Sequence, residues 1–308
     1  MQLLSKPTKF DFVGQRRKAV WFSVGLLLLS LLSLGFRGLD LGIDFTGGTL
    51  VEVGYPGPAD VEKAREALAE AGFPEAIVQH FGTNSEVLVR IAPRDELNKA
   101  ELSTTLEDAL EAAHGEQLEM RRVEFVGPQI GEELREDGGI AMLIALAGIL
   151  IYIALRFEWR FAIGSVAALA HDVVITLGFF SVIGIEFDLT VLAAVLAVIG
   201  YSLNDTIVVF DRVRENFRKL RRATVEQTAN ISLNQTLSRT LMTSLTTLLV
   251  LLALFFLGGE LIHGFATALI VGVFIGTYSS IYVATSSVLA LGARREDLLP
   301  MAKEGAEA

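Results

Sequence analysis

The sequence contains no cysteine among its 308 residues. Disulfide bonds, thiolate nucleophiles, and zinc or iron–sulfur centres held by cysteine are therefore excluded. Positive charge is also scarce, because 26 Lys and Arg face 36 Asp and Glu, which gives a net charge of −10. Phosphate binding is led by Lys and Arg, so this balance argues against a nucleic-acid partner.

Charge of either sign is sparse along the chain. Only 20% of the residues are charged, 52% are hydrophobic, and the mean hydropathy is +0.49. An ordinary water-soluble protein does not combine these values. We therefore expect a membrane protein that lies in a lipid bilayer.

Six apolar runs approach the length of about 20 residues that is needed to cross the hydrocarbon core of a bilayer. They are Val20–Phe36, Ile140–Leu155, Phe161–Ile183, Leu189–Phe210, Leu237–Leu257 and Phe265–Leu291. The first run lacks a convincing small-x-small cleavage site before Arg37, so we interpret it as a retained helix rather than a signal peptide. The sequence thus predicts a polytopic α-helical membrane protein with six transmembrane helices.

Basic residues gather at alternate ends of these runs. They occur in the N-terminal segment 1–19, at Arg156 and Arg160, in the connector 211–235, and in the tail 292–308. The connectors 184–188 and 258–264 contain acidic residues and no Lys or Arg. By the positive-inside rule, both termini and the basic loop 211–235 are expected on the cytoplasmic side.

Residues 37–138 separate the first two spans and hold 22 Asp and Glu against 9 Lys and Arg. Alternating and helical patterns predict a β-α-β-β-α-β order, with a turn at 82–85 between the middle strands. This order is typical of a ferredoxin-like α+β domain, here on the outer side of the membrane. His80 and His114 have no partner at metal-ligand spacing, so we expect a contact surface and no metal or catalytic site. The predicted strands and helices are 49–55, 59–71, 76–81, 86–91, 99–113 and 117–126.

Two charged residues interrupt the fourth and fifth apolar runs. A charge near the centre of a membrane helix costs about 2.5–3.5 kcal/mol, so Asp205 and Arg239 each need a partner, water or a function. Both are expected at similar depth, where they can pair. Arg239, Thr243 and Thr246 recur at helical spacing, so one face of the fifth helix can hold a line of water. The residues alone fit a proton carrier and a static structural ion pair equally well.

Other polar and small residues in the spans extend this picture. Asp172, in the middle of the third span, and Asn204, beside Asp205, are further candidates for a proton pathway. His171 precedes Asp172 but should point about 100° away, so the two need not act together. In the sixth span, small residues recur every four positions and predict close helix packing at Gly272, Gly276 and Ser280.

Three glycines lie just after the first span. Gly42, Gly47 and Gly48 surround Asp44 where the chain leaves the bilayer, and such residues supply the positive φ angles of tight turns. We expect a structural turn between the first helix and the first strand. The alternative is a hinge between the membrane part and the external domain.

Several separated motifs resemble the SecF family, the smaller half of the SecD–SecF export complex, which is similar in architecture to resistance-nodulation-division transporters. The matching segments are 42–49 (GIDFTGGT), 126–131 (VGPQIG), 202–206 (SLNDT), 210–212 (FDR) and 238–240 (SRT). The resemblance implies a bacterial inner-membrane protein that works with SecD, the SecYEG channel and a translocating polypeptide. It also implies that the proton motive force aids protein export and membrane insertion, with Asp205 and Arg239 implicated in proton conduction.

Two other functions remain open from the sequence. One is half of a proton-driven small-molecule or lipid exporter, against which the external segment of about 100 residues is short for a substrate pocket. The other is a non-conducting scaffold subunit. In each case we expect a membrane subunit without cofactor or metal rather than an enzyme.

Overall fold

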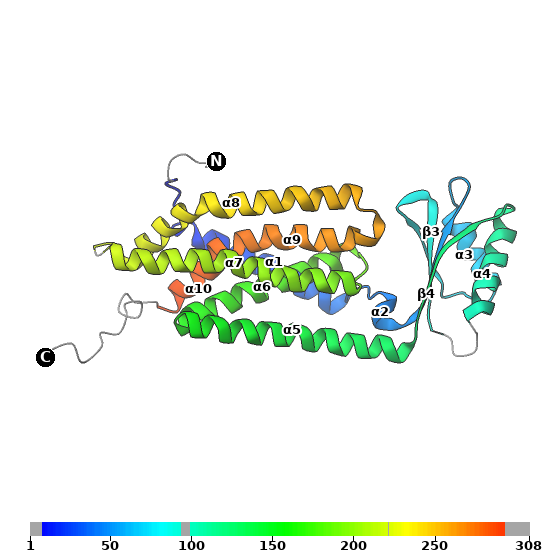
Figure 1. Cartoon of the computed structure of the whole chain (residues 1–308), viewed down its shortest axis with the longest axis horizontal. Helices are drawn as coiled ribbons and strands as arrows, with labels where there is room; N and C mark the ends of the chain where they lie inside the picture. Colours follow the sequence, from blue (N-terminus) through cyan, green and yellow to red (C-terminus); the bar gives the residue numbers. More distant parts are fainter. Residues whose placement is uncertain (1–7, 94–98, 221, 293–308) are drawn as a thin grey trace.

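The computed structural model describes residues 8–93, 99–220 and 222–292. Figure 1 shows a bundle of long helices with a small α+β domain at one end. Within the described ranges, six helical segments are long and apolar enough to cross a membrane, as the apolar runs predicted. They are α1 (Arg16–Phe36), α5 (Pro128–Arg156), α6 (Trp159–Ile183), α7 (Leu189–Lys219), α8 (Val225–Leu257) and a sixth, His263–Ala290.

The sixth segment changes its helical winding near its end. It begins as α9 (His263–Ser279), continues as a short π-helix, η2 (Ser280–Ala284), and ends as α10 (Thr285–Ala290). A single-turn 3₁₀-helix, η1 (Glu260–Ile262), precedes it. Short π-helical turns within α-helices occur frequently at functional sites.

Several helices extend far beyond their apolar runs. Helix α5 begins at Pro128 rather than near Ile140, and α7 continues to Lys219 rather than ending near Phe210. The basic segment 211–235, which we predicted as a loop, is therefore helical at 211–219 and at 225–235. Hydropathy marks only the lipid-facing length of a helix. Its polar ends are fixed by local signals such as the Thr224–Gln227 capping box that starts α8.

The bundle has three central helices and three outer ones. Helices α6, α7 and the α9 segment bury much of their surface, whereas α1, α5 and α8 expose most of theirs. Small residues allow close approach, since a Cβ atom added at Gly178 of α6 would lie 2.2 Å from Ser30 Cβ of α1. The Ser33 and Ser181 hydroxyls share a 2.7 Å hydrogen bond across the same pair of helices.

The external domain has the predicted β-α-β-β-α-β order. Its strands β1 (Gly48–Gly54), β2 (Ile77–Phe81), β3 (Thr83–Ile91) and β4 (Glu119–Val126) form one antiparallel sheet in the order β2-β3-β1-β4. Helices α3 (Val61–Glu70) and α4 (Lys99–His114) pack on the sheet. This is the ferredoxin-like arrangement. The predicted turn at 82–85 is shorter, because Gly82 adopts φ 72° and β3 already begins at Thr83.

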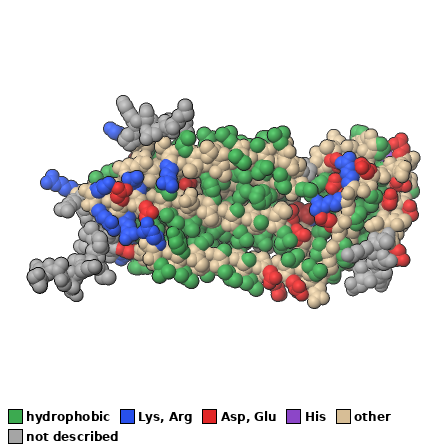
Figure 2. Space-filling view, in the orientation of Figure 1, with side chains coloured by type: hydrophobic (Ala, Val, Ile, Leu, Met, Phe, Trp, Pro, Cys, Tyr) green, Lys and Arg blue, Asp and Glu red, His purple; other side chains and the backbone are tan. Residues whose placement is uncertain are grey.

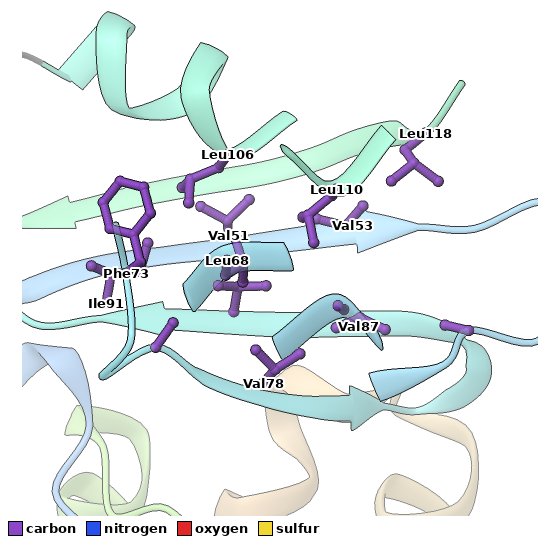
Figure 3. Packing of buried hydrophobic residues seen from close by; sticks show 14 of the residues in the cluster. Val51, Val53, Leu68, Phe73, Val78, Val87, Ile91, Leu106, Leu110 and Leu118 are labelled. Atoms are coloured by element: carbon purple, nitrogen blue, oxygen red, sulfur yellow. The ribbon is translucent and has the colours of Figure 1, made fainter. Parts of the chain in front are cut away.

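One hydrophobic core holds this domain together. Figure 3 shows Leu68 of α3 and Leu106 and Leu110 of α4 gathered around Val51 and Val53 of β1. Each of these side chains is at most 1% exposed. Alternate residues of β1 point to the helices, which is the period-two pattern that identified the strand.

Charge is distributed unevenly over the molecule. In Figure 2, Lys and Arg gather at the end of the bundle away from the external domain, and acidic side chains are numerous at the domain end. Few charged side chains appear on the hydrophobic surface between them. This is the surface expected of a bundle that crosses a bilayer.

Candidate functional site: buried carboxyl groups in the membrane bundle

Asp205 lies inside the bundle, on the face of α7 that packs against its neighbours. Its exposed fraction is 3%, and the carboxyl Oδ2 has no hydrogen-bond partner among the described residues. The adjacent Asn204 points to the opposite side of α7 and is exposed. Ser202 and Thr206 are also buried. They lie three positions before and one position after Asp205 on the same helix.

Arg239 of α8 does not make a close ion pair with Asp205. No salt bridge joins the two in the described part of the chain, and Arg239 is exposed on the surface of the bundle. The Arg239 charge and the Thr243 hydroxyl are nevertheless near enough to interact with the Asp205 carboxyl group. The arrangement is therefore not the static contact pair that was one reading of the sequence.

The predicted polar face of α8 is directed outward. Thr243 is half-buried and Thr246 is exposed, and each hydroxyl donates to backbone carbonyls of its own helix at 2.9–3.2 Å. Both hydroxyl oxygens can still accept a hydrogen bond, so a line of water along this face stays a prediction. Helix α8 is an outer helix of the bundle. Its stripe of Arg239, Thr243 and Thr246 therefore lies toward the surface.

Three buried polar atoms on the neighbouring helices α7 and α8 lack a hydrogen-bond partner within the described ranges. Besides Asp205 Oδ2, the buried hydroxyls of Thr206 and Thr240 have no hydrogen-bond partner within the described ranges. Thr206 follows Asp205 on α7, and Thr240 follows Arg239 on α8. Buried polar atoms are nearly always paired, so each of these three atoms is available to a water molecule or another polar partner.

Asp172 forms a second buried site, made by three helices. Its carboxyl Oδ2 accepts hydrogen bonds from Ser202 Oγ of α7 at 2.5 Å and from Ser279 Oγ of α9 at 2.7 Å. Asp172 is 1% exposed and lies near the middle of α6. The sequence singled out Asp172 but gave no signal for either serine, because they come from helices distant in the chain.

His171 also belongs to this second site, contrary to the expectation from helical geometry. Its Nδ1 lies 2.9 Å from Asp172 Oδ1, and its ring stacks near Tyr278 at 6.3 Å between centroids. Although neighbouring residues leave a helix about 100° apart, both side chains here bend into the same interior. The opposite nitrogen, Nε2, is buried and unpaired among the residues that the structure describes.

The small residues of α9 bring α7 and α9 into close contact. A Cβ atom at Gly272 would lie 2.1 Å from Val198 Cγ2, and one at Gly276 would lie 3.0 Å from Ser202 Cβ. Ser280 is fully buried and donates to Thr277 O at 3.0 Å. The close approach at Gly276 positions Ser202 beside Asp172.

The glycines after α1 make a compact turn. A four-residue helix, α2 (Ile43–Thr46), follows Gly42, and Gly47 and Gly48 then adopt φ 70° and 127°. A Cβ atom at Gly47 would lie 2.7 Å from Pro128 Cα of α5. The backbone conformation and the close approach both require glycine at this position.

The two buried sites contain carboxylate, hydroxyl and imidazole groups. Among the described residues, no group of three His, Asp or Glu side chains could hold a metal ion.

Known proteins resemble this chain over its whole length. It is 53% identical to the protein translocase subunit SecF of Vibrio alginolyticus, over 99% of this chain and 98% of the relative. The SecF subunits of Pseudomonas aeruginosa and Escherichia coli O157:H7 are 51% and 46% identical, over 94% and 97% of this chain and 94% and 93% of theirs. The chain belongs to the SecF family.

Family-wide patterns and a solved structure agree with this assignment. Residues 105–294 match "Protein export membrane protein SecD/SecF, C-terminal", and residues 32–55 match "SecD/SecF GG Motif". The crystal structure of SecDF, a translocon-associated membrane protein from Thermus thermophilus, superposes with a TM-score of 0.84 at 43% identity. The match covers 96% of this SecF chain and 40% of that longer SecDF chain. Both the six-helix membrane part and the short segment that contains Gly47 and Gly48 are thus features of the family.

Proposed function

We propose that this SecF chain is an accessory subunit of the Sec protein translocase that pairs with SecD and uses proton movement to aid export and membrane insertion. It works beside the SecYEG channel on a translocating polypeptide, in the inner membrane. The observation that carries the proposal is the buried carboxyl group of Asp205, whose Oδ2 has no hydrogen-bond partner among the described residues.

Asp205 is the proton-binding group in this proposal. Its carboxyl group is buried, lacks full hydrogen bonding and interacts with Arg239 without a contact ion pair. A buried carboxylate takes up or releases a proton as a nearby cation withdraws or approaches. Movement of α8 relative to α7 therefore changes the protonation of Asp205, and protonation biases the helix positions in return.

The exposed stripe on α8 supports a subunit contact. An arginine exposed to hydrocarbon costs about 2.5–3.5 kcal/mol, so Arg239 needs a polar neighbour outside this chain. SecD supplies that neighbour in the proposal, and Asn204, Thr243 and Thr246 lie along the shared polar path. Asp172 with His171 forms a second proton-binding position farther inside the bundle.

The charge distribution supports one orientation. Lys and Arg lie at the end of the bundle opposite the external domain, so that end and both termini face the cytoplasm and the domain faces the periplasm. A membrane potential then supplies about 2.3 kcal/mol per charge per 100 mV. One proton suffices for a modest helix rearrangement.

The test compares Asp205→Asn with Asp211→Asn in vesicles that contain SecD and the translocase. Asp211 is a matched control, because it lies on the same helix but is exposed and pairs with Arg156 at 3.0 Å. We expect Asp205→Asn and Arg239→Met to abolish proton-dependent stimulation of export and proton flux, while Asp211→Asn keeps both. Full activity of Asp205→Asn would leave only the scaffold function.

A further inference from the structure

The outer end of α7 is joined to the external domain by a compact set of contacts that the proposed function does not use. The connector 184–188 links α6 to α7, and residues 40–45 lead from α1 into the domain (Figure 1). Leu41 and Phe187 form an isolated parallel β-bridge. Gly42 N–H donates to Phe187 O at 2.9 Å, and Phe187 N–H donates to Asp40 O at 2.7 Å.

Asp44 binds the first turn of α7 directly. Its Oδ2 accepts a 3.0 Å hydrogen bond from the backbone N–H of Leu189, the first residue of α7. The helix's own cap, Asp188, binds Val191 N–H at 2.8 Å. Two carboxylates thus hold the N–H groups of one helix end, where the helix dipole favours negative charge.

Arg90, on strand β3, contacts the segments that precede α2 and α7. Its side chain is 14% exposed and reaches from β3 to Asp40 Oδ1 at 2.8 Å, Leu41 O at 2.9 Å and Glu186 Oε1 at 3.4 Å. One guanidinium therefore contacts residues before α2 and in the connector before α7. Its planar set of donors suits several oxygen acceptors at fixed angles.

Apolar and backbone contacts complete the junction. The Phe45 and Phe187 rings stack with centroids 5.8 Å apart, and both side chains are buried. Behind them, Gly47 and Gly131 bring α2 against α5 at backbone distance. The junction therefore combines β-pairing, charge, ring stacking and close backbone packing, which leaves little freedom between α7 and the domain.

We propose that Asp44 and Arg90 are positioning residues that fix the outer end of α7 to the external domain, so that displacement of α7 at Asp205 moves the domain as a rigid body. This rests on the proposed function of Asp205. Sixteen residues of one continuous helix separate Leu189 from Asp205, which is about 24 Å at 1.5 Å per residue. A continuous helix held by its backbone hydrogen bonds can transmit a displacement over that distance.

The first experiment removes the Asp44 contact in the full chain with SecD and the translocase. We expect Asp44→Ala to keep proton flux within about twofold while export stimulation falls about tenfold, because the two ends become uncoupled. Asp44→Asn retains an oxygen acceptor for Leu189 N–H and should restore most of the stimulation. The matched control is Asp60→Ala, which removes the cap of α3 in the same domain and should change neither activity.

Two outcomes would overturn the proposal: equal coupling in Asp44→Ala and Asp60→Ala, or parallel loss of flux and export in Asp44→Ala. Hydrogen exchange at residues 184–191 gives a readout that is independent of protons. We expect at least tenfold faster exchange in Asp44→Ala, and unchanged exchange would refute the fixation itself. A wild-type complex without proton flux would instead refute the proposed function of Asp205.

The second experiment locks the junction with a disulfide bond. Because the chain has no native cysteine, no other disulfide can form within it. Leu41→Cys with Phe187→Cys places the two cysteines directly across the β-bridge, since these residues are bridge partners. If the junction stays closed throughout the cycle, the oxidised and reduced forms should stimulate export equally. Loss of activity on oxidation, reversed by reductant, would show that the junction opens and would overturn rigid transmission.

Discussion

The close contact of α9 with α7 at Gly272 predicts a large effect from one added methyl group. The Cβ atom of Gly272→Ala would lie 2.1, 2.6 and 2.9 Å from the Cγ2, Cγ1 and Cβ atoms of Val198. Ordinary carbon contacts lie at about 3.5–4.0 Å. Because all three atoms of the branched group are too close, rotation of Val198 about χ1 cannot relieve the clash.

Relief therefore requires the helices to separate by about 1.5 Å, and overpacking of this kind costs about 1–3 kcal/mol. The separation also acts on the Asp172 site, since Ser202 and Ser279 donate to its carboxyl group from α7 and α9 at 2.5 and 2.7 Å. We expect Gly272→Ala to lower the free energy of unfolding by that amount and to weaken both hydrogen bonds.

Thermal unfolding of the purified full chain in detergent measures the effect. Gly200→Ala is the matched control, because a Cβ atom there meets nothing within 4 Å and alanine favours a helix by up to about 1 kcal/mol. Val198→Ala removes the two closest of these three atoms and leaves only Cβ, so the double variant should be more stable than the sum of the two single changes predicts. Equal unfolding of Gly272→Ala and Gly200→Ala, or strict additivity in the double variant, would refute the reasoning.

Three further predictions concern the external domain and its base. Gly47→Ala should lower the free energy of unfolding by about 1–3 kcal/mol more than Gly72→Ala, as measured by thermal unfolding. Both glycines have positive φ, but only a Cβ atom at Gly47 would meet backbone, 2.7 Å away. Equal losses of stability would contradict this. Leu106→Ala should lower the free energy of unfolding in urea by about 2–5 kcal/mol, because the side chain is fully buried, whereas Leu106→Met should cost under about 1.5 kcal/mol. Burial of the Glu186 carboxyl, opposed by Arg90 and reinforced by three neighbouring aspartates, raises its pKa above 4.5. Its contribution to stability is therefore full below pH 4.5 and is lost as pH rises through the higher folded pKa. Glu186→Gln should flatten this part of the pH dependence of unfolding, and an unchanged profile would exclude Glu186 as its source.

Local sequence patterns predicted much of the fold. The six spans followed from apolar runs of the right length, and the ferredoxin-like domain followed from the period of its apolar residues. Val51 and Val53 alternate along a strand, and Leu102, Leu106 and Leu110 recur along one helix face. Such signals lie within one element, so a single sequence contains them.

Helix ends and side-chain surroundings were harder to predict. Helix α7 continues through the basic residues after Phe210, because helical structure does not stop where hydropathy does. The sequence identified Asp205 and Arg239 as charges in apolar runs. It did not indicate that Arg239 is exposed or that the two make no contact ion pair, since those facts depend on how α8 is rotated against α7.

The sequence by itself determined that the chain is a six-span membrane protein with a ferredoxin-like external domain, and it placed ionisable residues within the spans. Hydropathy and periodicity are local properties of the sequence. They nearly suffice to predict the spans, because a segment that crosses a bilayer must satisfy its own backbone hydrogen bonds as a helix. Only the tertiary structure decided that Asp172 binds His171, Ser202 and Ser279, and that Asp44 caps α7 from across the junction. Those contacts join residues up to 145 positions apart, and packing between helices, rather than any segment's own pattern, sets which of them meet.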